Sequence, residues 1–302
     1  MTKDSKAIGV LGMGLVGTAI TEILLEKGYR VHVWNRTAEK TQPLVEKGAI
    51  AEETPAAVGN ACERVFISVM STDAVRELCE GPEGLLSAKN PPRYILDTTT
   101  GDPNETVALA ERLACQGVTL LDATISGSSL QIRCREGLYM IGGNHDAYLD
   151  CEDLFREVTK KYEYLGPSGS GSKAKLASNV ILGLNRLVLA EGLVFAEKIG
   201  LDIARLLPVL KRSPAYSVAM DVKGEKMVTG DFAPQSRIIQ HLKDLHIVKQ
   251  YADETGQCLP LTEVHLDIMK CAIEAGDGEK DNCVVIEEVR RRRKSSPDGP
   301  LK

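Results

Sequence analysis

Residues 7–17 are Ala-Ile-Gly-Val-Leu-Gly-Met-Gly-Leu-Val-Gly, and their pattern indicates the fold class of the N-terminal half. Its first half, Ala7–Leu11, is a compact apolar run that predicts a buried strand. Helix-type spacing of apolar residues then runs through Glu26 and stops at Gly28. A strand, a glycine-rich turn and a helix in this order are typical of the first unit of an α/β sheet.

The turn between that strand and helix matches the pattern GxGxxG. Gly12 permits a tight turn, Gly14 lets a pyrophosphate approach the backbone, and Gly17 allows close packing of the helix on the strand. Amide groups at the helix N-terminus add donors for an anion. The motif therefore predicts a dinucleotide-binding loop, and a glycine-rich turn without a ligand is the alternative.

Short β-branched runs alternate with helical patterns through the first half of the chain. Further strands are expected at Arg30–Trp34, Val65–Val69, Tyr94–Asp97, Leu120–Ala123 and Leu138–Ile141. Helical spacing lies between and after these runs, as in Pro103–Cys115. This alternation predicts a parallel, doubly wound sheet of the Rossmann type.

The pattern changes at the glycine- and serine-rich segment 166–172. A long helical pattern follows, from Lys173 to about Lys198, and runs that favour strands largely vanish downstream. We therefore expect an α/β domain in residues 1–165 and an all-helical domain in residues 166–302.

Composition and charge exclude several classes of partner. The chain carries 37 Lys and Arg against 42 Asp and Glu, and only 4% aromatic residues. It is therefore a poor nucleic-acid binder, which needs clustered cations and stacking platforms. The basic run Arg290–Lys294 is interpreted as a solvated helix end, and a nucleic-acid or partner role is the alternative. No uninterrupted apolar run reaches the roughly 18 residues that span a bilayer, so no membrane association is expected.

Eight cysteines are scattered along the 302 residues. None forms a CxxC pair, and none has nearby histidines at a spacing suited to zinc. Reduced thiols in a cytoplasmic protein without a metal are the expectation.

The end of the second predicted strand discriminates between cofactors. NAD-binding proteins usually place Asp or Glu there, where it accepts hydrogen bonds from the ribose hydroxyls. Here the residues are Asn35-Arg36-Thr37, with Lys40 one turn later. Arg36 offers a planar, permanently charged fork to a 2′-phosphate. This favours NADP over NAD, and simple surface cations are the alternative.

Two further segments carry candidate chemistry. In Asp122–Ser129 a strand ends in a small polar turn, where the Ser126 hydroxyl and the amides of Gly127 and Ser128 could hold a carboxylate. An ordinary tight turn is the alternative there.

On the long helix, Lys175 and Asn179 are four residues apart and share a face. A lysine beside an apolar stripe can have its pKa lowered by desolvation, as acid–base work near neutrality needs. A solvated lysine is the alternative, and Lys173 fits that description better. Lys243 and Asp244, in a helical apolar pattern, are by themselves more typical of a surface ion pair.

Taken together, these motifs make the chain resemble the β-hydroxyacid dehydrogenases, which include 3-hydroxyisobutyrate dehydrogenases and glyoxylate or succinic semialdehyde reductases. The resemblance covers about residues 7–290. It rests on the glycine loop and on Asp97-Thr98-Thr99-Thr100, Asp122–Gly127, Gly169–Asn179 and Lys243-Asp244-Leu245.

The resemblance implies a role for each matching residue. Lys175 would be the general acid or base, Asn179 would orient the substrate, and the turn at Ser126, Gly127 and Ser128 would grip a substrate carboxylate. Lys243 would lie beside both nicotinamide and substrate. The residues expected to contact the cofactor are Gly12, Met13, Gly14, Leu15, Val16, Asn35, Arg36, Thr37, Val69, Met70, Thr99 and Lys243.

The sequence departs from the family pattern in three places. Thr124 replaces a proline, Ser128 replaces a glycine, and Ser178 stands where many members have asparagine. The related 6-phosphogluconate dehydrogenases have histidine at that last position, so decarboxylation of a sugar phosphate is disfavoured. These departures leave open which short hydroxy acid is the substrate.

The resemblance implies reversible hydride transfer between NADP(H) and a short hydroxy acid or its aldehyde or keto acid, in a homodimer or homotetramer. One alternative is an imine reductase-like enzyme, since those enzymes share the Asn-Arg-Thr strand end but usually lack the lysine. Another is a catalytically inactive NADP-binding interaction module, like a nuclear relative without the lysine. Lys175 favours the dehydrogenase.

Overall fold

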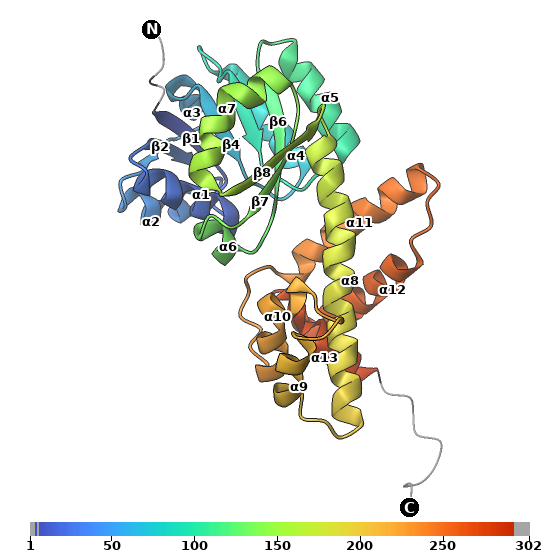
Figure 1. Ribbon diagram of the computed structural model, residues 1–302. Coiled ribbons are helices and arrows are strands. Elements are labelled where there is room, and N and C mark those ends of the chain that lie inside the picture. Colours follow the sequence, from blue (N-terminus) through green and yellow to red (C-terminus); the bar gives the residue numbers. More distant parts are fainter. Residues whose placement is uncertain (1–3, 5, 293–302) are drawn as a thin grey trace, which may run out of the picture. The chain divides into compact units, whose positions relative to one another are not determined.

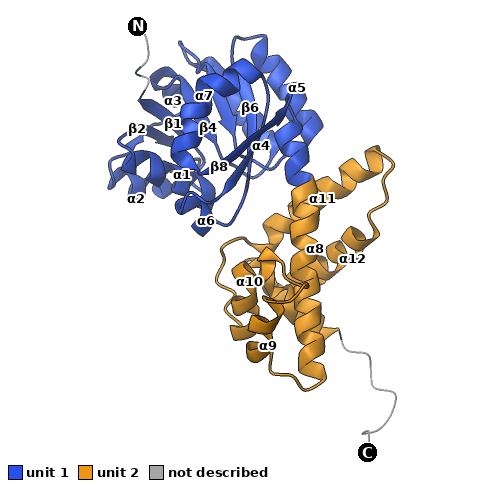
Figure 2. Cartoon of the chain, viewed as in Figure 1, with its two compact units in different colours: residues 1–176 blue, residues 177–302 orange. Residues whose placement is uncertain are grey.

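The computed structural model describes Asp4 and residues 6–292 (Figure 1). Residues 293–302, which include the end of the basic run at Lys294, lie outside the described part of the chain. The chain divides into two compact units, residues 1–176 and 177–302 (Figure 2). This division falls later than the expected boundary at residue 165, because the long helix begins within the first unit.

An eight-stranded sheet forms the centre of the first unit. Its strands are β1 (Ala7–Leu11), β2 (Arg30–Trp34), β3 (Ile50–Ala51), β4 (Arg64–Ile67), β5 (Tyr94–Asp97), β6 (Thr119–Ser126), β7 (Leu138–Gly142) and β8 (Lys161–Gly166). They lie in the order β3-β2-β1-β4-β5-β6-β7-β8. The first six strands of this order have the arrangement of a Rossmann fold, so the predicted fold is confirmed.

Three features of the sheet differ from the expectation. Strand β7 pairs with β6 in antiparallel orientation, so the sheet is not parallel throughout. The short connection through α6 (Ser129–Arg133) explains this, since a parallel crossover needs a dozen residues or more. Strands β3 and β8 were not expected; β8 alternates exposed and half-buried residues at the sheet edge, which leaves no apolar run. The strand expected at Val65–Val69 ends at Ile67.

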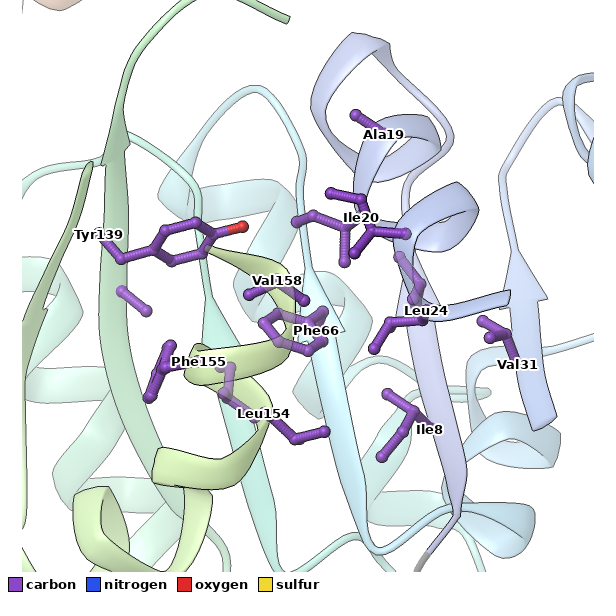
Figure 3. Close-up of a cluster of buried hydrophobic side chains, with 14 of the residues drawn as sticks. Ile8, Ala19, Ile20, Leu24, Val31, Phe66, Tyr139, Leu154, Phe155 and Val158 are labelled. Atoms are coloured by element: carbon purple, nitrogen blue, oxygen red, sulfur yellow. The ribbon is translucent and has the colours of Figure 1, made fainter. Parts of the chain in front are cut away.

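Helices cover both faces of the sheet (Figure 1). They are α1 (Leu15–Glu26), α2 (Gln42–Val45), α3 (Pro55–Ala61), α4 (Thr72–Glu80), α5 (Pro103–Ala114), α6 and α7 (His145–Val158), with short 3₁₀ turns η1 (Ala38–Thr41) and η2 (Leu85–Ser87). One core packs α1 and α7 against side chains such as Ile8 and Phe66 (Figure 3). A second core packs α3, α4 and α5 against Leu11 and Ile67. Alternate residues of the central strands therefore supply two different cores.

The long helix α8 (Ser170–Lys198) starts against the end of β6. The buried Asp122 carboxylate accepts hydrogen bonds from the amides of Gly169 (2.9 Å) and Ser172 (2.8 Å). A Cβ on Gly171 would lie 2.4 Å from the carbonyl oxygens of Asp122 and Met140. The glycines at this domain boundary therefore allow close packing, and the helix begins at Ser170, before the predicted start at Lys173.

Helices make up the second unit. After α8 they are α9 (Ile203–Leu210), α10 (Val218–Thr229), α11 (Ile238–Glu254), α12 (Pro260–Ala272) and α13 (Val285–Arg291), with single turns η3 (Ile273–Asp277) and η4 (Asn282–Val284). Their apolar faces form one core, so the predicted all-helical domain is confirmed.

By length and composition, α8 could cross a membrane, and it is the one such helix in the described part of the chain. Half of that apolar window is buried inside the structure. The core helix of a globular domain meets the same criterion, so this observation is weak support for a membrane span.

Candidate functional site

The candidate cofactor site begins where β1 and β4 lie side by side. From this pair the chain builds β2 and β3 on one side and β5 and β6 on the other. Such a switch point opens a crevice at the carboxyl ends of the strands, where α/β sheets bind ligands. Backbone hydrogen bonds between neighbouring strands continue past the strand ends. Gly12 N–H donates to Trp34 O, and Ser68 N–H donates to Leu11 O, both at 2.9 Å.

The glycine loop follows β1 at this edge of the sheet. Its three glycines differ in what a side chain at each position would contact. Gly12 has a φ of 96°, and a Cβ there would lie 2.2 Å from Ser68 O. A Cβ on Gly17 would lie 1.9 Å from Gly12 O. A Cβ on Gly14 would meet no protein atom within 4 Å. Packing within the protein thus accounts for Gly12 and Gly17 but leaves open space at Gly14, as a loop that admits a diphosphate needs.

The N-terminus of α1 suits an anion. Gly14 is the N-cap residue, with no side-chain cap, and the first turn contains no acidic residue. Leu15 is exposed, and Val16 packs partly against the core. The amide groups and the helix dipole at this end therefore favour a negatively charged group.

Asn35 connects the glycine loop to the end of β2. Its Oδ1 accepts a hydrogen bond from the Met13 amide (2.9 Å), and its Nδ2 donates to Thr37 O (2.7 Å). The Met13 side chain is buried in the core. Asn35 and Met13 thus shape the loop from within the protein.

Arg36 lies beside this loop and is exposed. Among the described residues it forms no hydrogen bond or ion pair through its side chain, and the exposed Lys40 lies four residues later. The guanidinium is therefore available to an added phosphate, although Glu39 in η1 places one carboxylate in the same segment.

The loops after β4 and β5 are tied to each other. Thr99 Oγ1 accepts a hydrogen bond from the Val69 amide (3.2 Å), and Thr98 Oγ1 donates to Ile67 O (2.9 Å). Met70 next to this tie is 53% exposed. The predicted cofactor-lining segments are therefore brought together at the same edge of the sheet.

In the turn after β6, some of the polar groups form hydrogen bonds within the turn itself. Ser128 caps the short helix α6 through a capping box. Its backbone N–H donates to Gln131 Oε1 (2.8 Å), and its hydroxyl oxygen accepts from the backbone N–H of Gln131. Ser126 is half-buried and Gly127 exposed. A carboxylate-binding role for this turn therefore falls to Ser126 and Gly127 rather than to the Ser128 amide.

Lys175 and Asn179 both lie on α8 and are both buried, with exposed fractions of 8% and 2%. Lys173, two residues before Lys175, is exposed. The description of a solvated lysine near a helix start therefore fits Lys173 and not Lys175.

In the second unit, Asp244 of α11 links two predicted site residues. Asn179 Nδ2 donates to Asp244 Oδ2 (3.0 Å), and Lys243 Nζ lies 3.0 Å from Asp244 Oδ1. Lys243 and Asp244 are thus an ion pair, as their sequence suggests, but one that is partly buried and bonded to Asn179. This bond fixes the orientation of the Asn179 amide.

A buried polar cluster next to this contact was not found from the sequence. It comprises Arg186 of α8, His241 of α11 and His265 of α12. Arg186 Nη2 lies 3.3 Å from His241 Nε2, and the two imidazole centroids are 5.4 Å apart. Burial lowers the pKa of Arg186 to about 10, so it stays charged at neutral pH. Single histidines in helical patterns give no signal that would have predicted the cluster.

Among the described residues, no group of three or more His, Cys, Asp or Glu side chains is arranged to hold a metal ion.

We expect the glycines of the loop to respond differently to alanine. Gly17→Ala should lower the free energy of unfolding by about 1–3 kcal/mol through overpacking against Gly12 O. Gly14→Ala should change it by less than about 0.5 kcal/mol, because its φ of −81° suits alanine and its Cβ meets open space. Gly14→Ala should still weaken NADPH binding about tenfold or more, measured by fluorescence titration. Unchanged NADPH affinity in Gly14→Ala would refute the assignment of the loop.

Stability should depend on pH through His265. Burial, followed by the charge of Arg186, lowers the pKa of His265 from 6.5 to about 4. Between about pH 6.5 and pH 4, His265 is therefore protonated in the unfolded chain but neutral in the folded chain. The free energy of unfolding falls as the pH decreases through this range. Up to about 3 kcal/mol is at stake, at about 1.4 kcal/mol for each pH unit. Urea unfolding followed by circular dichroism should show this slope in the wild type, and His265→Gln should flatten it. His246→Gln, which changes an exposed histidine of α11, is the control; equal slopes in both variants would contradict the assignment.

Two family models match the chain and together cover most of it. The NAD-binding domain of 6-phosphogluconate dehydrogenase matches residues 7–166. The NAD-binding domain of NADP-dependent 3-hydroxyisobutyrate dehydrogenase matches residues 169–289.

Among curated proteins, the cytokine-like nuclear factor N-PAC of Gallus gallus is 31% identical over 287 residues, or 94% of this chain. The match covers 52% of that protein, so the chain spans about half the length of this relative.

Solved structures confirm the fold along nearly the whole chain. A 3-hydroxyisobutyrate dehydrogenase from Salmonella typhimurium superposes with a TM-score of 0.85 at 22% identity, covering 93% of this chain and 99% of that one. Psf3 in complex with NADP⁺ and 2-OPP gives 0.86 at 23% identity, covering 93% and 99%. An imine reductase from Pseudomonas gives 0.63 at 22% identity, covering 94% and 99%. With the glycine loop, the two matched domain models and this fold, the chain belongs to the β-hydroxyacid dehydrogenase family.

Proposed function

We propose that the chain is an NADP-dependent oxidoreductase that interconverts a short hydroxy acid and its aldehyde or keto acid. The observation that carries the proposal is the burial of Lys175 one helical turn before Asn179. Substrates of the 3-hydroxyisobutyrate, glyoxylate or succinic semialdehyde class fit a turn that offers Ser126 and Gly127 to a carboxylate. Membership of the family supports the same class of reaction.

The residues divide the work as follows. When bound, the nicotinamide accepts or gives the hydride. Lys175 Nζ takes the proton of the substrate hydroxyl in oxidation and returns it to the developing alkoxide in reduction. Asn179, whose Nδ2 is held by Asp244, orients the substrate oxygen. Lys243, whose Nζ lies 3.0 Å from Asp244 Oδ1, is proposed as a substrate-binding residue.

Residues of the first unit support NADP as the cofactor. The open space at Gly14 admits the diphosphate, and the exposed Arg36 offers its fork to the 2′-phosphate. Psf3, with the same fold, binds NADP⁺. Since NADPH is a reductant, reduction of an aldehyde acid is the proposed direction.

We also propose that a second copy of the chain covers α8, in a homodimer or homotetramer. Ile181, Val188, Phe195 and Ile199 form an apolar stripe on one face of this helix, and each is 58–68% exposed. Exposed apolar surface of this kind marks a protein interface more often than a free surface. All eight cysteines are free thiols, four of them buried, which supports a cytoplasmic location.

Lys175→Ala tests the reaction. Turnover with NADPH should fall about 10²- to 10⁴-fold, because a positioned acid–base group contributes that much, while NADPH affinity stays near wild type. Glyoxylate, succinic semialdehyde, 3-hydroxyisobutyrate with NADP⁺, and cyclic imines form the substrate panel. Lys173→Ala, which removes an exposed lysine of the same helix, should keep full activity.

The panel also separates the alternatives. Turnover of cyclic imines alone would favour an imine reductase-like enzyme. Tight NADPH binding without turnover of any substrate would favour a non-catalytic module, an alternative that the similarity to a nuclear factor supports. Full carbonyl reduction by Lys175→Ala would contradict the role of the lysine.

Arg36→Ala tests the cofactor preference. We expect NADPH affinity to fall about 10- to 100-fold, the value of one or two charge-assisted hydrogen bonds, with NADH affinity unchanged. Isothermal titration with both cofactors measures this. Lys89→Ala, at an exposed lysine before β5, is the control. Equal loss of both cofactors in Arg36→Ala would leave no basis for a preference.

A further inference from the structure

The buried cluster of Arg186, His241 and His265 rests on a glycine. Gly183 lies one turn after Asn179 on α8. A Cβ on Gly183 would lie 2.6 Å from both His241 Nε2 and His265 Cε1. The imidazoles of α11 and α12 are therefore packed on the bare backbone of α8, and any side chain at residue 183 would push them away.

Arg186 fixes the chemical state of His241. A guanidinium offers only donors, so His241 Nε2, 3.3 Å from Arg186 Nη2, must accept. The His241 proton then resides on Nδ1. Arg186 is 3% exposed, so this bond is sheltered from competing water.

Two contacts therefore join the same pair of helices at neighbouring turns. Asn179 bonds Asp244, and Gly183 and Arg186 contact His241. His241 and Asp244 are three residues apart, so they share a face of α11. The apolar core that α8 and α11 share already packs them together, and the two polar contacts add directional restraints on the axial position and rotation of α11. The contact at His241 thus supports the position of Asp244 and Lys243, one turn further along α11.

We propose that Gly183, Arg186 and His241 form a positioning contact that holds the Lys243–Asp244 pair against Asn179. The three residues touch neither substrate nor cofactor in this role and act through Asp244. The inference rests on the proposed function for its effect on turnover, and on the helix contacts alone for its effect on α11.

Gly183→Ala is the first test. We expect kcat of carbonyl reduction to fall about tenfold or more at a temperature where the variant is folded, with NADPH affinity unchanged because the glycine loop belongs to the first unit. Hydrogen exchange of residues 238–246 should quicken relative to α10. The control is Glu191→Ala on the same helix, which removes an exposed side chain outside the apolar stripe of α8. It should retain wild-type kcat and exchange.

Arg186→Met is the second test and keeps the inference open to refutation if Gly183→Ala does not fold. It removes a buried charge and the bond to His241 while filling similar volume, so folding is expected to survive. We expect the same fall in kcat, with a smaller change in KM. Because both variants act through His241, their effects should be less than additive in the double variant.

The results that would overturn the positioning contact differ from those that would overturn the proposed function. Lower melting temperatures with wild-type kcat in both variants would show a merely structural role and overturn the proposal, as would additive effects. If the wild type reduces no substrate of the panel, the proposed function fails, and the exchange of residues 238–246 decides the positioning contact alone. Unchanged exchange in Gly183→Ala and Arg186→Met would then overturn it.

Discussion

The Asp122 carboxylate is the contact on which the placement of Lys175 depends. It is buried at the end of β6 and binds the Gly169 and Ser172 amides at the start of α8. Burial raises the pKa of this carboxyl, and hydrogen bonds from Ser172 and Gly169 oppose that rise. A helix whose first turn is bonded to a strand cannot rotate freely, so Lys175, one turn further on, has a defined direction.

Close approach to bare backbone recurs in both units. Gly17 lets α1 meet the carbonyl of Gly12, Gly171 lets α8 meet β6, and Gly183 lets two imidazoles meet α8. In each case a methyl group would lie within 2.6 Å of another atom. Gly14 is the contrast, since no protein atom explains its lack of a side chain. Glycines thus distinguish packing constraints from a ligand constraint.

Much of the first unit was predictable because its signals are local. The strands Ala7–Leu11, Arg30–Trp34 and Tyr94–Asp97 were predicted at their observed bounds. The reversal at β7 was not, since strand direction depends on the length of a connection whose helix α6 has only five residues. Segment 166–172 was interpreted only as the boundary between the domains, because composition does not distinguish a flexible glycine from one packed against a strand.

In the candidate site, too, the residues with local sequence signals were predictable and the others were not. The glycine loop was predicted from a motif, and the pair Lys175 and Asn179 from helical spacing. The cluster of Arg186, His241 and His265 comes from three separate helices, and single polar residues in amphipathic patterns carry no record of their partners. The commitment of the Ser128 amide to Gln131 was equally invisible, because a capping box and a ligand-binding turn use the same residue types.

The division of the chain inside α8 has a consequence for dissecting the protein. Residue 176 ends one unit and residue 177 begins the other, yet both lie within a single uninterrupted helix. Scission there would cut the chain between Lys175 and Asn179, leaving residues 170–176 on one part and residues 177–198 on the other, each with unpaired backbone groups at its new end. Modular exchange with other proteins is therefore better attempted at the turn around residue 167, where the backbone of β8 ends and no helix is cut.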